Sequence, residues 1–209
     1  MGQEAVLLVE GKDDMHVLLA ILHHHGMIMS PDFIEQFEGI DKLLENLEVR
    51  LRLTDLKRLG VVVDADEPLS TRWSQVVAVL SRAGYTNLPG TPDPKGTIFD
   101  PPDSLHPVVG VWLMPNNILP GMLEDFVKFL VPPGDRLLKR AMESVASIPA
   151  GERLFSEGHL SKAQIHTWLA WQEEPGRPMG LAIKAKFLDP SCKQAVDLTA
   201  WARRVFPEI

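Results

Sequence analysis

Acidic or amide side chains follow three short apolar runs that are typical of strands in a parallel sheet. The residues are Glu10 after the run 5–9, Asp64 and Asp66 after the run 61–63, and Asn116 after the run 108–114. Ligands of open parallel sheets bind outside the carboxyl ends of the strands, so these side chains are predicted to meet at one edge of the sheet. Glu124 follows shortly beyond Asn116 and is expected in the same region.

The pair Asp64 and Asp66 predicts a site for a divalent cation. The two residues are two positions apart, so in extended backbone their side chains point the same way. Carboxylates that converge repel one another unless a cation offsets them, and a site made of oxygen atoms suits Mg²⁺ or Mn²⁺. Gly11 allows a tight turn and close backbone approach, which frees Glu10 to reach the same space. The remaining positions around such a cation are available to a phosphate.

The elements that position these residues alternate between strand and helix. Apolar runs or alternation predict strands at 5–9, 33–37, 61–63 and 108–114, and apolar residues three and four apart predict helices at 13–25, 40–58, 70–83 and 121–130. Strands that alternate with helices are typical of βαβ units. We therefore predict an α/β fold with a mostly parallel, Rossmann-like, four-stranded sheet that is flanked by helices.

The rest of the chain is predicted to be a helical extension of this core. Helices are expected at 134–147, 161–172 and 198–206, the second capped by Ser161, whereas the proline-rich segment 86–107 is expected to be irregular or a loose hairpin. In the stretch 181–188, Lys184 and Lys186 alternate with apolar residues, so one face of a strand would be basic. That face is either solvated or contacts a phosphate backbone. We divide the chain into an α/β core, 1–131, and a mainly helical extension packed on it, 132–209.

The composition is that of an ordinary globular protein. Of 209 residues, 45% are hydrophobic and 23% are charged. No apolar run approaches the roughly 20 residues of a membrane-spanning helix, and no basic segment with a following apolar stretch opens the chain, so we predict a cytoplasmic protein without a membrane partner. The single cysteine, Cys192, excludes an internal disulfide framework and a zinc site built from cysteines.

The charge is negative and unevenly distributed. The formal net charge is −7, with −9 in residues 1–131 and +2 in residues 132–209. This balance argues against a surface that is wholly an electrostatic footprint for nucleic acid. The excess of carboxylates in the first two thirds instead agrees with a cation site at the ends of the predicted strands.

Two motifs give the chain a resemblance to a known family. Val-Glu-Gly-Lys-Asp-Asp at 9–14, followed by Val-Val-Val-Asp-Ala-Asp at 61–66, resembles the Toprim domain of topoisomerases, bacterial primases, recombination proteins and, more distantly, the OLD-family nucleases. The wider sequence, including Gly-Met-Leu-Glu-Asp at 121–125, is similar to an uncharacterised bacterial Toprim-related family, a DUF3226-like domain of unknown function. The Toprim resemblance covers about residues 4–130, and the resemblance to the uncharacterised family extends through the C-terminal third.

The resemblance implies a Toprim-like fold, a magnesium site and a phosphodiester substrate. Glu10 would act as a general acid or base or as a metal ligand, Asp64 and Asp66 would hold Mg²⁺, and Glu124 or Asp14 would help to bind a second metal. The residues expected beside the substrate are Gly11, Lys12, Asp14 and Asn116. Relatives also work with a separate ATPase, which is therefore an expected partner. The chain lacks a tyrosine-bearing topoisomerase domain, a zinc-binding primase module and an ATPase segment, so topoisomerase and primase functions are not expected.

Each of these residues also has a simpler interpretation. Glu10 could be a solvent-facing acid that caps the next turn, and Asp64 and Asp66 could be turn residues before Pro68. Asp-x-Asp also occurs in glycosyltransferases and in haloacid-dehalogenase phosphatases, although the earlier Glu-Gly favours the Toprim interpretation. Lys12 could be an ordinary exposed turn residue.

Other residues that suggest chemistry are expected to be structural. Three neighbouring histidines, 23–25, diverge by about 100° each on a helix and cannot all face one ion. Cys192 has no basic partner of a catalytic type beyond its neighbour Lys193, so we expect an ordinary thiol. Trp168, Trp171 and Trp201 are expected to pack in the core or at an interface.

The sequence leaves more than one function open. The first hypothesis is a Mg²⁺-dependent enzyme that cleaves phosphodiesters of nucleic acid, with Glu10 assisting proton transfer. The second is a non-catalytic module that binds metal together with a nucleotide or a protein. The third is a metal-dependent phosphatase that acts on a small substrate.

Overall fold

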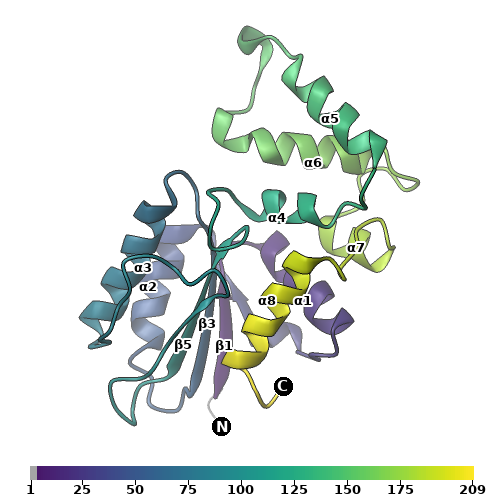
Figure 1. Cartoon of the computed structure of the whole chain (residues 1–209). Helices are drawn as coiled ribbons and strands as arrows, with labels where there is room; N and C mark the ends of the chain where they lie inside the picture. The colour runs from purple at the N-terminus through teal and green to yellow at the C-terminus, as the bar shows by residue number, and fades with distance from the viewer. Residues whose placement is uncertain (1–3) are drawn as a thin grey trace.

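A five-stranded sheet forms the centre of the computed structural model, which describes residues 4–209 (Figure 1). The strands are β1 (Ala5–Val9), β2 (Ile34–Gln36), β3 (Arg58–Asp64), β4 (Thr97–Phe99) and β5 (Val108–Met114), in the order β2-β1-β3-β5-β4. All neighbours are parallel except β4, which runs antiparallel to β5. The α/β prediction is confirmed, and the bounds predicted for β1 and β5 match the structure.

The predicted number of four strands is wrong, because β4 was not expected as a strand. Its three residues lie within the proline-rich segment 86–107, where no alternation long enough to predict a strand exists. Ile98 pairs with Gly110 at the edge of the sheet, so the segment is a hairpin arm of β5. The pairing depends on β5 as a template and therefore leaves little local signal.

Helices cover both faces of the sheet (Figure 1). The eight helices of the described residues are α1 (Lys12–His24), α2 (Ile40–Arg50), α3 (Leu69–Arg82), α4 (Leu123–Phe129), α5 (Arg136–Ala146), α6 (Leu160–Ala170), α7 (Met179–Lys184) and α8 (Lys193–Val205). Helices α2 and α3 share one buried apolar cluster with one face of the sheet, and α1, α4, α7 and α8 share a second cluster with the other face. The sheet is thus the middle of three layers, and its strands are apolar on both sides.

Helix α8 reaches the sheet through two glycines that are register partners. Gly60 of β3 lies opposite Gly110 of β5. A Cβ atom at Gly60 would lie 2.9 Å from Phe206 Cζ, and one at Gly110 would lie 2.1 Å from Val205 Cγ2. The missing side chains form a depression that the end of α8 fills. The C-terminal helix is therefore part of the three-layer core.

Helices α5 and α6 stand beyond the carboxyl ends of the strands, next to α4 (Figure 1). The second of them begins after His159, and Ser161 does not cap it as predicted, because its hydroxyl donates a hydrogen bond to Asp125 of α4 instead. That contact joins the extension to the core close to the strand ends. The boundary at residue 131 stays a prediction.

Two further expectations about secondary structure are wrong. The helix predicted at 40–58 ends at Arg50, and turns in which Leu56 is buried and Leu53 is exposed lead into β3. The stretch 181–188 is not a strand: α7 ends at Lys184, and Lys186 adopts a positive φ of 64°. The segment is helical because α7 packs closely against α1. The contact is so close that a Cβ at Gly180 would lie 2.7 Å from the His16 carbonyl oxygen. No helix among residues 4–209 has the length and apolar character needed to cross a membrane.

Candidate functional site

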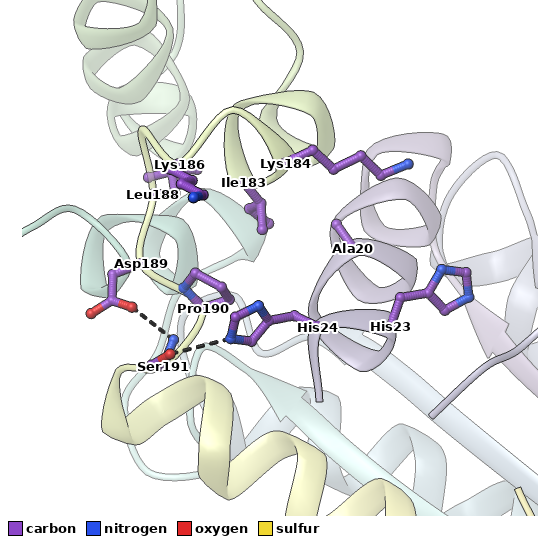
Figure 2. Close-up of a pocket in the computed structure, with 10 residues that line it drawn as sticks. All are labelled: Ala20, His23, His24, Ile183, Lys184, Lys186, Leu188, Asp189, Pro190 and Ser191. Atoms are coloured by element: carbon purple, nitrogen blue, oxygen red, sulfur yellow. Dashed lines mark hydrogen bonds between the residues drawn. The ribbon is translucent and has the colours of Figure 1, made fainter. Parts of the chain in front are cut away.

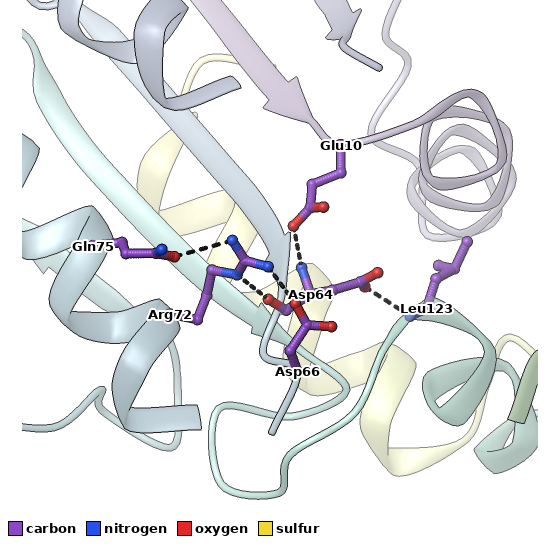
Figure 3. A network of polar contacts seen from close by, with 6 residues as sticks. All are labelled: Glu10, Asp64, Asp66, Arg72, Gln75 and Leu123. Carbon is purple, nitrogen blue, oxygen red and sulfur yellow. Dashed lines mark hydrogen bonds and ion pairs between the residues drawn. The ribbon is translucent and has the colours of Figure 1, made fainter. Parts of the chain in front are cut away.

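The site begins where β1 and β3 end side by side. Glu10 follows β1, and its Oε1 accepts a hydrogen bond of 2.9 Å from the backbone N–H of Asp64, the last residue of β3 (Figure 3). Parallel pairing of the two strands places both residues at one edge of the sheet. Burial is the main cause that raises the pKa of Glu10, the nearby Arg72 guanidinium opposes the rise, and Asp66 adds to it.

Asp64 lies deeper in the same edge and is fixed by α4. Its Oδ1 accepts a hydrogen bond of 2.8 Å from the backbone N–H of Leu123, the first residue of α4 (Figure 3). Burial raises the pKa of Asp64 well above its usual range, and the charges of Asp14, Glu10 and Glu124 raise it further. Four carboxyl groups therefore lie close to one another, two of them buried and two half-buried.

Asp14 completes this group from the first turn of α1. Only 7% of Asp14 is exposed, and its Oδ1 has no hydrogen-bond partner. Burial raises its pKa to about 7, with further contributions from the charges of Glu10 and Glu124. Gly11 makes room for it, since a Cβ at Gly11 would lie 3.2 Å from Asp14 Oδ2. An unpartnered buried carboxylate oxygen is costly and indicates a missing cation or proton.

Glu124 is the most buried acid of the group, and it forms an ion pair with a lysine of the C-terminal extension. It is 3% exposed, and its Oε1 lies 3.0 Å from Nζ of Lys162 on α6. Burial lowers the pKa of Lys162, but the hydrogen bond and charge of Glu124, with the charges of Asp13 and Asp64, raise it by more. We name Glu10, Asp14, Asp64 and Glu124 the carboxylate cluster. Lys162 was not predicted, because it is 38 positions away from Glu124 and carries no local motif.

Asp66 does not project beside Asp64 as predicted. The strand ends at Asp64, and Asp66 has a positive φ of 53°, so the alternation of an extended chain stops between them. The Asp66 carboxylate forms an ion pair with the Arg72 guanidinium, and Arg72 Nε donates a hydrogen bond of 2.9 Å to the Asp64 carbonyl oxygen (Figure 3). Arg72 is buried in α3 and also bonds to Gln75. Asp66 therefore lies at the rim, near Glu10, and faces a different partner from Asp64.

The other predicted site residues differ in how they relate to the carboxylate cluster. Gly11 precedes α1 and contacts Asp14, as described, whereas Lys12 is exposed at the start of α1 and has no hydrogen-bond or ion-pair partner in the described chain. Asn116 Oδ1 accepts hydrogen bonds from the backbone N–H groups of Ile118 and Leu119. Asn116 thus shapes the turn after β5, a role that polar residues commonly take in turns.

The carboxylate cluster has the donor set of a divalent-cation site. In the present side-chain conformations, no three Asp, Glu, His or Cys residues within 4–209 are arranged to hold a metal ion. The buried oxygen of Asp14 without a partner, and the raised pKa values of Asp14 and Asp64, fit a cation with oxygen ligands. Glu124 could join such a set if its ion pair with Lys162 opened.

An acidic cavity lies between the rim of the cluster and the extension. Its volume is about 290 Å³, and it is lined by Asp66, Glu67, Asp125, Glu157 and Ser161 among others. Lys128 of α4 ties the two sides together, because its Nζ donates hydrogen bonds of 2.8 Å to both Ser161 and Gln164. A polyanion would enter this cavity only with accompanying cations.

Fold and site together define an α/β protein whose mostly parallel sheet carries a cluster of four buried or half-buried carboxylates at its carboxyl edge. A family model described as "Protein of unknown function (DUF3226)" matches residues 4–207. The chain belongs to this family. Comparison with curated proteins and with solved structures gave no match.

Proposed function

We propose that this protein is a Toprim-like, Mg²⁺-dependent enzyme that hydrolyses phosphodiester bonds of nucleic acid. The observation that supports this proposal is the carboxylate cluster, in which a buried Asp14 oxygen has no partner among residues 4–209. Buried acids that face one another are stabilised by a divalent cation, and oxygen ligands favour Mg²⁺ or Mn²⁺. The motifs at 9–14 and 61–66 agree with it.

Asp64, Asp14 and Glu124 would hold the cation, with Asp66 at the rim as a further candidate ligand. When bound, Mg²⁺ or Mn²⁺ neutralises charge on phosphoryl oxygens and lowers the pKa of water. Leu123 N–H keeps one Asp64 oxygen oriented, so that side chain is preorganised. Arg72 holds the backbone around Asp64 and the Asp66 carboxylate together. These contacts fix the donors before any ligand arrives.

Glu10 would accept the proton from the attacking water. Its Oε1 is oriented by the Asp64 N–H, and burial raises its pKa, which makes the carboxylate a stronger base. Lys12 and Lys162 bring positive charge to the same edge, where they would attract a phosphate group. A separate ATPase, which the resemblance implies as a partner, belongs to this proposal.

A second candidate function is a non-catalytic module that binds a metal ion and a small phosphate ligand. The acidic lining of the 290 Å³ cavity favours this alternative, because it repels a long polyanion. A small ligand with one or two phosphates meets less repulsion. The two candidates share the cation site and differ in whether a phosphodiester bond is cleaved.

Cleavage of nucleic acid under matched conditions tests the proposal. Supercoiled plasmid and single-stranded RNA are incubated with the protein in Mg²⁺ or Mn²⁺, beside Asp64→Asn and Glu10→Gln. Asp55→Asn is the control, because Asp55 is exposed in a turn before β3 and has no partner in the described chain. We expect the wild type and Asp55→Asn to cleave nucleic acid. The cleavage rate of Asp64→Asn and of Glu10→Gln should be lower by at least about 100-fold, because one loses a metal ligand and the other a general base.

Equal cleavage by all four proteins would mean a contaminating nuclease and would refute the proposal. Absence of cleavage, together with Mg²⁺ binding that Asp64→Asn abolishes, would favour the binding module. Hydrolysis of p-nitrophenyl phosphate without cleavage of nucleic acid would identify a phosphatase instead.

A further inference from the structure

A second cavity lies at the opposite end of α1 from the carboxylate cluster. Its volume is about 550 Å³, and it is bounded by the last turn of α1, the end of α7 and the segment that leads to α8 (Figure 2). Asp14 and His24 are ten residues apart on α1, so the two sites are separated by about 15 Å along the helix axis. The cavity is thus a separate site, and its size is within the range of small-molecule pockets.

The floor of the cavity is apolar. Ala20 of α1, Ile183 of α7, and Leu188 and Pro190 of the following segment line it, and all four are buried. Close packing explains the opening: α7 touches the α1 backbone at Gly180, and the small side chain of Ala20 leaves space further along α1. Such a floor suits the organic part of a ligand.

Two lysines without partners line the same cavity. Lys184 ends α7 and Lys186 follows it, and the ammonium group of neither has a hydrogen bond or an ion pair with any described residue. In Figure 2 they lie on either side of Ile183, across from His24, Pro190 and Ser191, and the ammonium group of Lys184 is directed away from Lys186. Lysine ammonium groups are point charges that bind phosphate. The two charges match a phosphate dianion.

Lys186 holds its position despite an unfavourable backbone conformation. Its φ of 64° is in the left-handed region, where glycine is the preferred residue. Backbone hydrogen bonds fix this turn, from Lys186 N to the Ile183 carbonyl oxygen and from Phe187 N to the Ala182 carbonyl oxygen. A lysine at this position lowers the stability of the fold relative to glycine, and it places a positive charge at the cavity.

The wall opposite the lysines supplies polar groups, and its carboxylate, Asp189, accepts a hydrogen bond from the backbone of the same wall. His24 Nε2 is hydrogen-bonded to Ser191 Oγ at 3.2 Å, and His25 Nε2 is hydrogen-bonded to the Pro190 carbonyl oxygen at 2.8 Å. Asp189 Oδ1 accepts a hydrogen bond of 2.8 Å from the Ser191 backbone N–H. Each histidine therefore holds a different residue of the wall in place, and the two side chains do not converge on an ion.

We infer that this cavity binds a small organic phosphate, with the phosphate at Lys184 and Lys186 and the organic part on the apolar floor. The inference does not depend on the proposed function at the carboxylate cluster. The two lysines noticed in the sequence thus line one cavity between α1 and α7, and their exposed side chains would turn toward the same ligand when it binds.

Binding is tested by isothermal titration calorimetry in EDTA, with phenyl phosphate, adenosine 5′-monophosphate and inorganic phosphate as probes. The variants are Lys184→Gln and Lys186→Gly, and the control is Lys42→Gln, which makes the same change of charge as Lys184→Gln on the distant helix α2. We expect at least one organic phosphate to bind more tightly than inorganic phosphate, and each cavity variant to weaken it at least tenfold. Lys42→Gln should leave binding unchanged.

Two additional measurements separate this site from misfolding and from the carboxylate cluster. Lys186→Gly is expected to unfold at the same or a higher urea concentration than the wild type, since glycine relieves the left-handed backbone. Asp64→Asn should bind the probes as the wild type does. No binding of either organic phosphate at millimolar concentration, equal binding by the lysine variants, or inorganic phosphate as strong as both organic probes would overturn the inference. Loss of binding in Asp64→Asn would do so as well, because the ligand would then occupy the cluster.

Discussion

Replacement of Asp14 by Asn should remove a large pH dependence from the stability of the metal-free protein. Asp14 has its pKa raised from 3.8 to about 7, mainly by burial. The folded protein therefore binds a proton that the unfolded chain has released, and stability falls as the pH rises through this interval. Below pH 3.8 the contribution is fully present, and above about pH 7 it is lost.

The magnitude follows from the size of the shift. One pKa unit corresponds to about 1.4 kcal/mol, so raising the pH from 5 to 8 should cost the wild type on the order of 3 kcal/mol through Asp14. For a chain of this size that cost corresponds to a fall in Tm of about 10 °C. Asp64 and Glu10, whose pKa values are also raised by burial, act in the same direction. Mg²⁺ should reverse the loss at pH 8 and have little effect at pH 5, where protons compete for the same oxygens.

Urea and thermal unfolding, followed by circular dichroism between pH 5 and 8, measure this effect in EDTA and in Mg²⁺. Asp14→Asn should show a flatter profile than the wild type in EDTA and a smaller gain from Mg²⁺ at pH 8. The two proteins differ in this one carboxyl group, so the difference between the two profiles reports Asp14 together with its effect on the neighbouring Asp64. Asp55→Asn, which changes an exposed carboxylate, should follow the wild type. An Asp14→Asn profile that parallels the wild type throughout would refute the assignment of a buried, proton-binding carboxyl at this position.

Three further substitutions test other contacts. Lys162→Met should lower the Tm in EDTA, because Glu124 is 3% exposed and loses its partner, and Mg²⁺ should narrow the difference from the wild type. Gly110→Ala should destabilise the fold by roughly 1–3 kcal/mol in urea unfolding, since its Cβ would lie 2.1 Å from a Val205 methyl carbon of α8. Tyr85→Phe should cost about 1 kcal/mol in the same assay, because the buried hydroxyl donates a hydrogen bond of 2.6 Å to a backbone carbonyl oxygen before β5.

The strands of the sheet were predictable where their signal is local. The apolar runs at 5–9 and 108–114 became β1 and β5 with those bounds, and the run 61–63 became the centre of β3. Each of these strands is buried on both faces, so nearly every residue in it is apolar. The strand β4 has no such signal, because its three residues are ordered by pairing with β5.

The site was predictable only in part. The rule that ligands bind at the carboxyl ends of strands brought Glu10 and Asp64 to one edge, and the structure joins them by a hydrogen bond. The prediction that Asp66 projects beside Asp64 was wrong, since it assumed extended backbone and the chain turns after Asp64. Arg72, in the first turn of a predicted helix shortly after two acids, was a signal that could have been used. Its ion pair explains why Asp66 points elsewhere.

The sequence by itself determined the class of fold, the strands of the parallel core and the presence of acids at their ends, because apolar runs and turn residues are properties of short segments. Only the tertiary structure decided which carboxylates face one another, that Lys162 pairs with Glu124, and that α8 fills the depression at Gly60 and Gly110. These contacts join residues tens to more than a hundred positions apart. Their existence depends on how helices pack against the sheet, and no short segment carries that information.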